Sequence, residues 1–140
     1  ENGLRSGTVN IPGIIGLAEA CKIANFDTSN VEKIRNHLEK SLLKNFNCTV
    51  VGLHSPRSPF ITNIIFDGID ADVIIGQLQE TVLSTGSACS SEINEPSHVL
   101  KNMAIDNDMA FGSIRFSFSK YTSIEEINKA INELKLLIKQ

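Results

Sequence analysis

The stretch Ser113–Ser119, which reads SIRFSFS, alternates polar and apolar side chains without a break. In an extended strand, Ile114, Phe116 and Phe118 would share one face, and Arg115 would lie among serines on the other. Such alternation is typical of an antiparallel sheet that rests one face on a core and leaves the other open. The segment therefore predicts a half-covered sheet, around which the remaining elements must fit.

Helical patterns lie on both sides of this strand. The motif SIEE (123–126) is a capping box, in which a serine and a glutamate satisfy the first amides of a helix. It opens a C-terminal helix with an apolar stripe at Ile124, Ile127, Ile131, Leu134 and Ile138. A second capping box, SNVE (29–32), predicts an amphipathic helix that ends near Asn45, with Val31, Ile34, Leu38 and Leu42 inward. The segment 11–24 is apolar nearly all round, so it predicts a buried helix capped by Asn10.

Further short elements complete the pattern. Strands are expected at 48–53 and 60–68, with the proline-containing loop HSPRSP between them, and at 81–84. Asp70 should cap a helix over 71–80, and Pro96 should begin another with Val99, Leu100 and Met103 inward. The connections are too short for all strand pairs to be parallel. The sequence therefore predicts an α+β fold, a three- to four-stranded, mostly antiparallel sheet with helices on one face.

Composition narrows the function classes. The chain has 140 residues, a size typical of one domain, with 41% apolar and 21% charged residues, enough to bury a core. Its net charge of −3 argues against nucleic acid as the partner, and no apolar run suggests a membrane span. No signal peptide is visible, and because the chain begins with Glu1 rather than Met, we expect the natural N-terminus to lie further upstream.

The three cysteines differ in their surroundings. Their odd number and their spacing fit neither a disulfide framework nor a CxxC metal site, so reduced thiols are expected. Cys21 and Cys48 lie in apolar helix and strand segments, which favours a structural role. Cys89 instead lies in the polar loop STGSACSSEINEP (84–96), where an accessible thiol could act as a nucleophile. The alternative is an exposed cysteine without a role.

Three other features could bind a ligand. Arg115 has small serine neighbours, and its planar guanidinium suits a carboxylate, unless it pairs with a nearby Glu or Asp. The glycine-rich turn GLRSGTVN (3–10) could hold a phosphate, or it could be an ordinary entry to a helix. The histidines show no metal-ligand spacing. The three histidines are His37, His54 and His98. Of these, His98 could either partner Cys89 or be a surface residue.

The segments GLRSGTVNIPGIIGLAEA, STGSACSS followed by PSHVL, and SIRFSFSKYTSIEEI occur in this order. Together they resemble the C-terminal part of the cysteine desulfurases, pyridoxal-phosphate enzymes of class V aminotransferase type, and specifically the branch that serves iron–sulfur cluster and thio-cofactor synthesis. The resemblance covers residues 1 to about 138. It implies the small domain of a fold-type-I enzyme over 1–140, with 1–25 as the link to a large cofactor domain.

The resemblance also implies roles for single residues. Cys89 would take sulfur from L-cysteine as a persulfide while L-alanine leaves, Arg115 would bind the substrate carboxylate, and Thr8 would contact the phosphate of pyridoxal 5'-phosphate across a homodimer interface. No resident metal is implied, only a transient contact of Cys89 with an iron–sulfur cluster. The partners implied are an iron–sulfur scaffold or another sulfur-acceptor protein, in the cytoplasm or an organelle.

The family's cofactor lysine lies in a Ser-x-His-Lys stretch, and that motif does not occur here. We therefore expect a fragment that is inactive by itself. Two alternatives remain: a selenocysteine lyase or other class V enzyme, and a non-catalytic α+β interaction domain. No role for nucleic acid or a membrane is expected.

Overall fold

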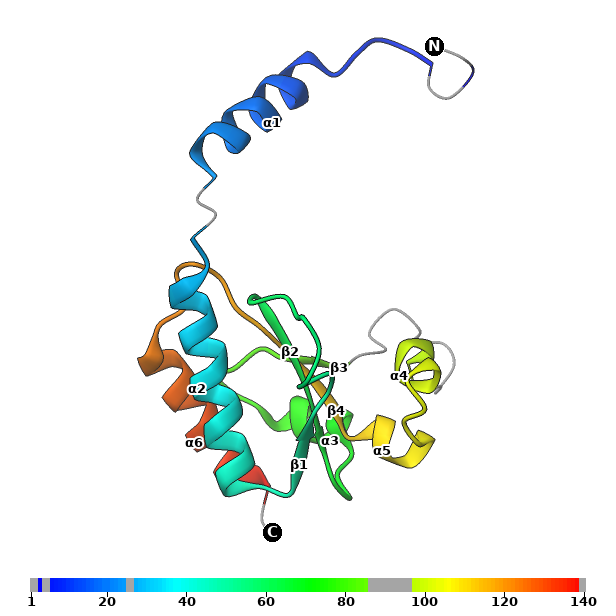
Figure 1. The fold of residues 1–140 in the computed structure, drawn as a ribbon, viewed down its shortest axis with the longest axis vertical. Coiled ribbons are helices and arrows are strands. Elements are labelled where there is room, and N and C mark those ends of the chain that lie inside the picture. The colour runs from blue at the N-terminus through cyan, green and yellow to red at the C-terminus, as the bar shows by residue number, and fades with distance from the viewer. Residues whose placement is uncertain (1–2, 4–5, 25–26, 86–96, 139–140) are drawn as a thin grey trace.

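The computed structural model describes residues 3, 6–24, 27–85 and 97–138 (Figure 1). In chain order the elements are α1 (Ile11–Ile23), α2 (Ser29–Asn45), β1 (Cys48–Val50), β2 (Ile61–Phe66), α3 (Ala71–Gln77), β3 (Ser84–Thr85), α4 (His98–Asn102), α5 (Asn107–Phe111), β4 (Ser113–Ser117) and α6 (Ile124–Leu137). Among the helices of these ranges, none has both the length and the hydropathy that crossing a bilayer requires.

The strands form one sheet in the order β1-β2-β4-β3, and every neighbouring pair is antiparallel. The predicted α+β fold is therefore confirmed, with β4 as a central strand. The strands are shorter than predicted, and the third begins only at Ser84, so most of the predicted 81–84 strand is connecting chain.

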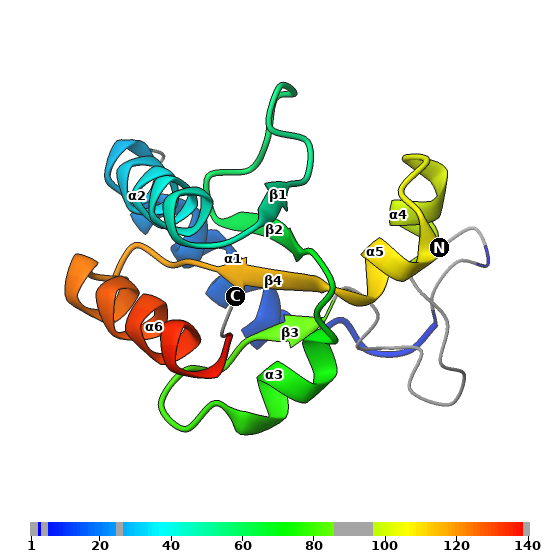
Figure 2. The same cartoon turned by 90° about the horizontal axis from the view of Figure 1, so that it is seen from below.

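Helices α2 and α6 lie side by side and cover one face of the sheet (Figures 1 and 2). The alternation of β4 places Ile114 and Phe116 on that face, where both are buried, as predicted. Each helix contributes most of its predicted apolar stripe to the same core, but Ile124 in the first turn of α6 is 38% exposed, so its predicted inward position is wrong. The buried stripe residues are Val31, Ile34, Leu38, Leu42, Ile127, Ile131, Leu134 and Ile138.

The two predicted capping boxes differ in outcome. In α6, Glu126 N donates to Ser123 Oγ and Ser123 N donates to Glu126 Oε2, at 3.2 and 2.8 Å, so that box is confirmed. In α2 the prediction is wrong by one residue. Thr28 is the N-cap and Ser29 is already helical, and the backbone amide of Ser29 donates to Asp27 Oδ1 at 3.0 Å.

Helix α1 forms as predicted, and Asn10 Oδ1 accepts from Gly13 N at 3.1 Å. The prediction that it is buried is wrong, because none of its residues is buried and Leu17 and Ile23 are 66% and 70% exposed. The physical reason is that α1 extends away from the sheet and its covering helices, so no described element lies against its apolar surface (Figure 1).

The segment between β3 and β4 also departs from prediction. In α4 only Leu100 is inward, whereas Val99 and Met103 are 53% and 48% exposed, because so short a helix presents a single contact residue to the core. Helix α5 was not predicted. It ends at Gly112, where an added Cβ would lie 2.2 Å from the carbonyl oxygen of Phe66.

Gly112→Ala is therefore expected to lower the free energy of unfolding by about 1–3 kcal/mol, the usual cost of forcing extra volume into a packed position. Urea denaturation of the wild-type and variant chains measures this. Gly76→Ala is the matched control, since a Cβ there meets nothing within 4 Å. Equal unfolding midpoints for Gly112→Ala and the wild type would contradict the close approach.

Candidate active site

The face of the sheet opposite α2 and α6 carries the side chains that alternate with the core residues. We call it the open face. Its buried end holds Ile65 and Ser113, each 2% exposed, and its accessible end holds Ile61 and Ser117, which are exposed. The described members are Thr49, Ile61, Asn63, Ile65, Ser84, Ser113, Arg115 and Ser117.

Arg115 lies in the middle of the open face. It is exposed, and its register partners are Asn63 on β2 and Ser84 on β3. Within the described ranges its guanidinium makes neither an ion pair nor a side-chain hydrogen bond, so the alternative of an arginine paired with a nearby Glu or Asp is not observed. An exposed guanidinium with five donors at the centre of a sheet can accept a carboxylate from solution.

The two serines that flank Arg115 are not equivalent. Ser117 is exposed, as expected for a small neighbour that leaves room for a ligand. Ser113 is buried and donates from Oγ to Asn63 Oδ1 at 2.9 Å, so it orders a neighbour instead of leaving space. Asn63 was missed from the sequence. The only signal was the pair of polar residues, Thr62 and Asn63, that interrupts the apolar run of β2, and the partner strand could not be identified by pattern.

Cys89 lies outside the described residues, and so does Arg5. What the structure does describe is the strand that leads to the cysteine segment. Ser84 of β3 pairs with Arg115, and Cys89 follows Thr85 by four positions in the sequence. His98, the first residue of α4, is exposed, which agrees with the alternative of a surface residue, and the alternative pairing with Cys89 involves a residue outside the described ranges.

Thr8 lies in the exposed segment that precedes α1. Figure 1 shows this segment and α1 apart from the sheet, so the structure does not bring Thr8 and Arg115 together. The expected contact with a cofactor phosphate therefore stays a prediction.

The remaining thiols and imidazoles do not form a second site. Cys48 is half-buried, and burial raises the pKa of its thiol to about 11, which agrees with a structural role. Cys21 is exposed, so its predicted burial is wrong for the same reason as that of α1. His37 Nε2 is 3.0 Å from Asn128 Oδ1. In the part of the chain that the structure describes, no cluster of His, Cys, Asp and Glu could hold a metal ion.

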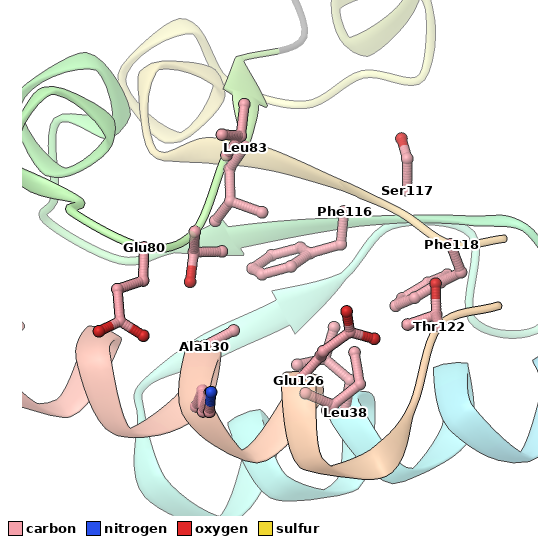
Figure 3. A pocket seen from close by; sticks show the side chains of 13 residues that line it. Leu38, Glu80, Leu83, Phe116, Ser117, Phe118, Thr122, Glu126 and Ala130 are labelled. Atoms are coloured by element: carbon pink, nitrogen blue, oxygen red, sulfur yellow. The ribbon is translucent and has the colours of Figure 1, made fainter.

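A hollow of about 410 Å³ opens between α6 and the chain entering β3 (Figure 3). Phe116 and Phe118 turn toward α6 within it, whereas the Ser117 hydroxyl lies on the other side of β4. The hollow therefore belongs to the helix-covered side of the sheet, and Arg115 does not line it. No cysteine is among the described residues that line it, so the open face is the better candidate site.

The profile of the family described as aminotransferase class V matches residues 1–130, a range that includes Thr8, Cys89 and Arg115. The chain belongs to the class V aminotransferase family. Among curated proteins, cysteine desulfurases of Enterobacter agglomerans and Mus musculus are 40% and 34% identical to it, over 96% and 98% of this chain. A protein named cysteine desulfurase IscS from Anaeromyxobacter sp. (strain K) is 35% identical over 94%.

The fold agrees with this membership. The X-ray structure of a NifS-like protein from Rickettsia africae ESF-5 matches 96% of the chain with a TM-score of 0.80 at 29% identity. The matched region is 36% of the NifS-like protein's own chain. The chain spans about a third of the curated relatives, namely 35%, 34% and 32% of the three named above. A second solved NifS-like protein gives a TM-score of 0.75.

Class V aminotransferases as a family imply pyridoxal phosphate, and the described residues can be tested against that group. None of the four strands carries a lysine, so the open face offers no amine for the covalent bond to the cofactor. It does offer the Arg115 guanidinium, which has no ion-pair partner among the described residues. The described residues thus fit the carboxylate of a substrate but not the attachment of the cofactor.

Proposed function

We propose that the chain is the C-terminal part of a cysteine desulfurase that uses pyridoxal phosphate and moves sulfur from L-cysteine to Cys89. The observation that supports it most strongly is Arg115, a guanidinium without a protein partner in the described residues, beside the strand that leads to Cys89. The curated relatives reported above carry the name cysteine desulfurase, which favours cysteine over selenocysteine and an enzyme over a non-catalytic interaction domain.

In the proposed reaction the Cys89 thiolate attacks the sulfur of the substrate. A sulfur–sulfur bond forms and the substrate's carbon–sulfur bond breaks, with its electron pair left on the three-carbon fragment. That carbon takes up a proton, L-alanine leaves, and Cys89 holds a persulfide. When bound, pyridoxal phosphate is the group that withdraws electrons from the substrate carbon.

The chain's own residues have two tasks in this scheme. Arg115 holds the carboxylate and so fixes the position of the substrate sulfur, since a guanidinium pairs with both carboxylate oxygens. Four residues of chain span at most about 14 Å, so a cysteine four positions after Thr85 is tethered to the strand beside Arg115. Short tethering raises the local concentration of the thiolate near the substrate.

The remaining parts of the proposal concern partners. Thr8 would contact the cofactor phosphate of a second subunit in a homodimer, which agrees with its position away from the sheet of its own chain. The persulfide would pass to an iron–sulfur scaffold or another sulfur-acceptor protein, in the cytoplasm or an organelle. Residues 1–25 would link this small domain to the cofactor domain.

Arg115→Ala in the full-length protein is expected to raise the KM for L-cysteine about 10- to 100-fold, since a hydrogen-bonded contact to a charged group contributes about 1.5–3 kcal/mol. Steady-state assays of alanine release measure it, with circular dichroism to check the fold. Lys135→Ala, which removes an exposed positive charge on α6, is the control and should leave KM unchanged. A folded Arg115→Ala enzyme with a wild-type KM would refute the assignment.

A further inference from the structure

Asn63 is the nearest cross-strand neighbour of Arg115 on the open face. Phe66 N donates to Gly112 O, and Phe118 N donates to Phe60 O. The backbone N–H and C=O groups of the even-numbered residues of β4 therefore point toward β2. The pair Asn63 and Arg115 is therefore of the non-hydrogen-bonded type, in which opposing side chains approach most closely. The two side chains therefore leave the same face of the sheet from Cβ atoms about 4.5–5.5 Å apart.

A hydrogen bond from Ser113 fixes the orientation of the Asn63 amide. Ser113 Oγ, on a buried residue, donates to Asn63 Oδ1 at 2.9 Å, so the oxygen is turned toward the buried end of the face. The nitrogen Nδ2 is bonded to the other side of the same carbon and points away from Ser113. Within the described ranges it donates to no protein acceptor, although Asn63 is half-buried. No buried side-chain nitrogen or oxygen among the described residues lacks a partner, so Nδ2 is reachable from solvent and can donate to a ligand.

We propose that Asn63 is a second binding residue for the anion that Arg115 pairs with, its Nδ2 donating to a substrate carboxylate oxygen. This inference rests on the proposed function and adds a residue to it. A carboxylate offers about four acceptor positions, of which a bidentate arginine uses two. A neutral donor fills a third without adding charge. Together the two groups select substrates that carry a carboxylate, because a substrate without one would leave both unpaired.

Asn63→Asp tests this in the full-length protein. The new carboxylate can still accept from Ser113, so the fold is preserved, but it replaces the Nδ2 donor by a negative charge beside Arg115. We expect the KM for L-cysteine to rise at least 10-fold, and the dissociation constant of L-alanine, measured by calorimetry, to rise in parallel. Asn132→Asp, the same change on the exposed side of α6, is the matched control.

Ser113→Ala provides a second variant. It leaves Asn63 in place but frees its amide, so a smaller rise in both constants is expected, about 2- to 5-fold, consistent with the loss of one hydrogen bond of about 0.5–1 kcal/mol. Unchanged constants in both variants, with Arg115→Ala impaired, would overturn the role of Asn63 and leave the proposed function standing. If Arg115→Ala is also unimpaired, the carboxylate site itself is wrong.

Discussion

Replacing Cys89 by serine is expected to abolish sulfur transfer in the full-length protein, with no alanine release above background. The reason is that the acceptor of the sulfur must be a thiolate. A cysteine ionises near pH 8.5 and lower beside positive charge, whereas a serine hydroxyl does not ionise in this range and cannot form a persulfide. The fold and the colour of the bound cofactor should be unchanged, because a polar loop residue contributes little to a core.

The assay follows sulfide and alanine from L-cysteine with and without a reductant. Cys48→Ser and Cys21→Ser are the matched controls. Burial raises the pKa of the Cys48 thiol to about 11, so it stays protonated at neutral pH, and Cys21 lies on α1 away from the sheet. Both controls should retain activity. Sulfide release at the wild-type rate from Cys89→Ser would end the case for Cys89 as the acceptor.

Glu39→Ala is expected to lower the free energy of unfolding by about 3–5 kcal/mol, the cost of leaving one partner of a buried ion pair alone. Glu39 is 5% exposed, although it lies on α2 among apolar stripe residues. Its carboxylate accepts from Arg57 Nη1 and Nη2 at 2.7 and 3.1 Å, and from Thr62 Oγ1 at 2.7 Å. Through Arg57 these bonds attach the loop between β1 and β2 to the helix, and through Thr62 they attach β2 itself.

The pH dependence of the stability difference separates the effect of the Glu39 charge from the effect of its packing. Burial by itself raises the pKa of Glu39, but the hydrogen bonds from Arg57 and Thr62 outweigh it and hold the pKa below its ordinary value of 4.5. The contribution of the Glu39 charge to the free energy of unfolding is therefore complete above pH 4.5, and it is lost as the pH falls through the lowered pKa of the folded state. The stability difference between wild type and Glu39→Ala should shrink in urea titrations carried out at progressively lower pH.

Glu80→Ala is the control for both measurements, because the Glu80 side chain is exposed and its removal should change stability by less than about 0.5 kcal/mol. A Glu39→Ala chain as stable as the Glu80→Ala chain would show that the buried ion pair contributes nothing.

The sequence predicted what depends on local periodicity. Alternation in Ser113–Ser117 placed Arg115 on an open face, and the stripe of α6 was correct from Ile127 onward, whereas Ile124 is exposed. What it could not predict depends on register. Nothing in the composition of β2 says that Asn63 stands opposite Arg115, or that Ser113 is buried, because both follow from which strands pair and where α5 ends.

The errors have the same origin. Periodicity describes which face of a helix is apolar but not whether another element covers it, so α1 was predicted as buried and is exposed. Glu39 and Arg57 were both missed because an ion pair between a helix and a loop leaves no local pattern. The cysteine loop was identified from composition, and the role of Cys89 stays a prediction, since the structure describes no residue between 86 and 96.

The absence of α1 from the core has a practical consequence. The hydrophobic cluster begins at Val31, and no described side chain before that residue belongs to it. A gene truncated just after residue 24 would lose no interior contact among the described residues, while it would remove the apolar helix that favours aggregation in dilute buffer. Such a minimal unit would keep Arg115 and the cysteine loop. It is of a size suited to isotope-edited NMR, in which unlabelled sulfur-acceptor proteins could be titrated and their footprints mapped amide by amide.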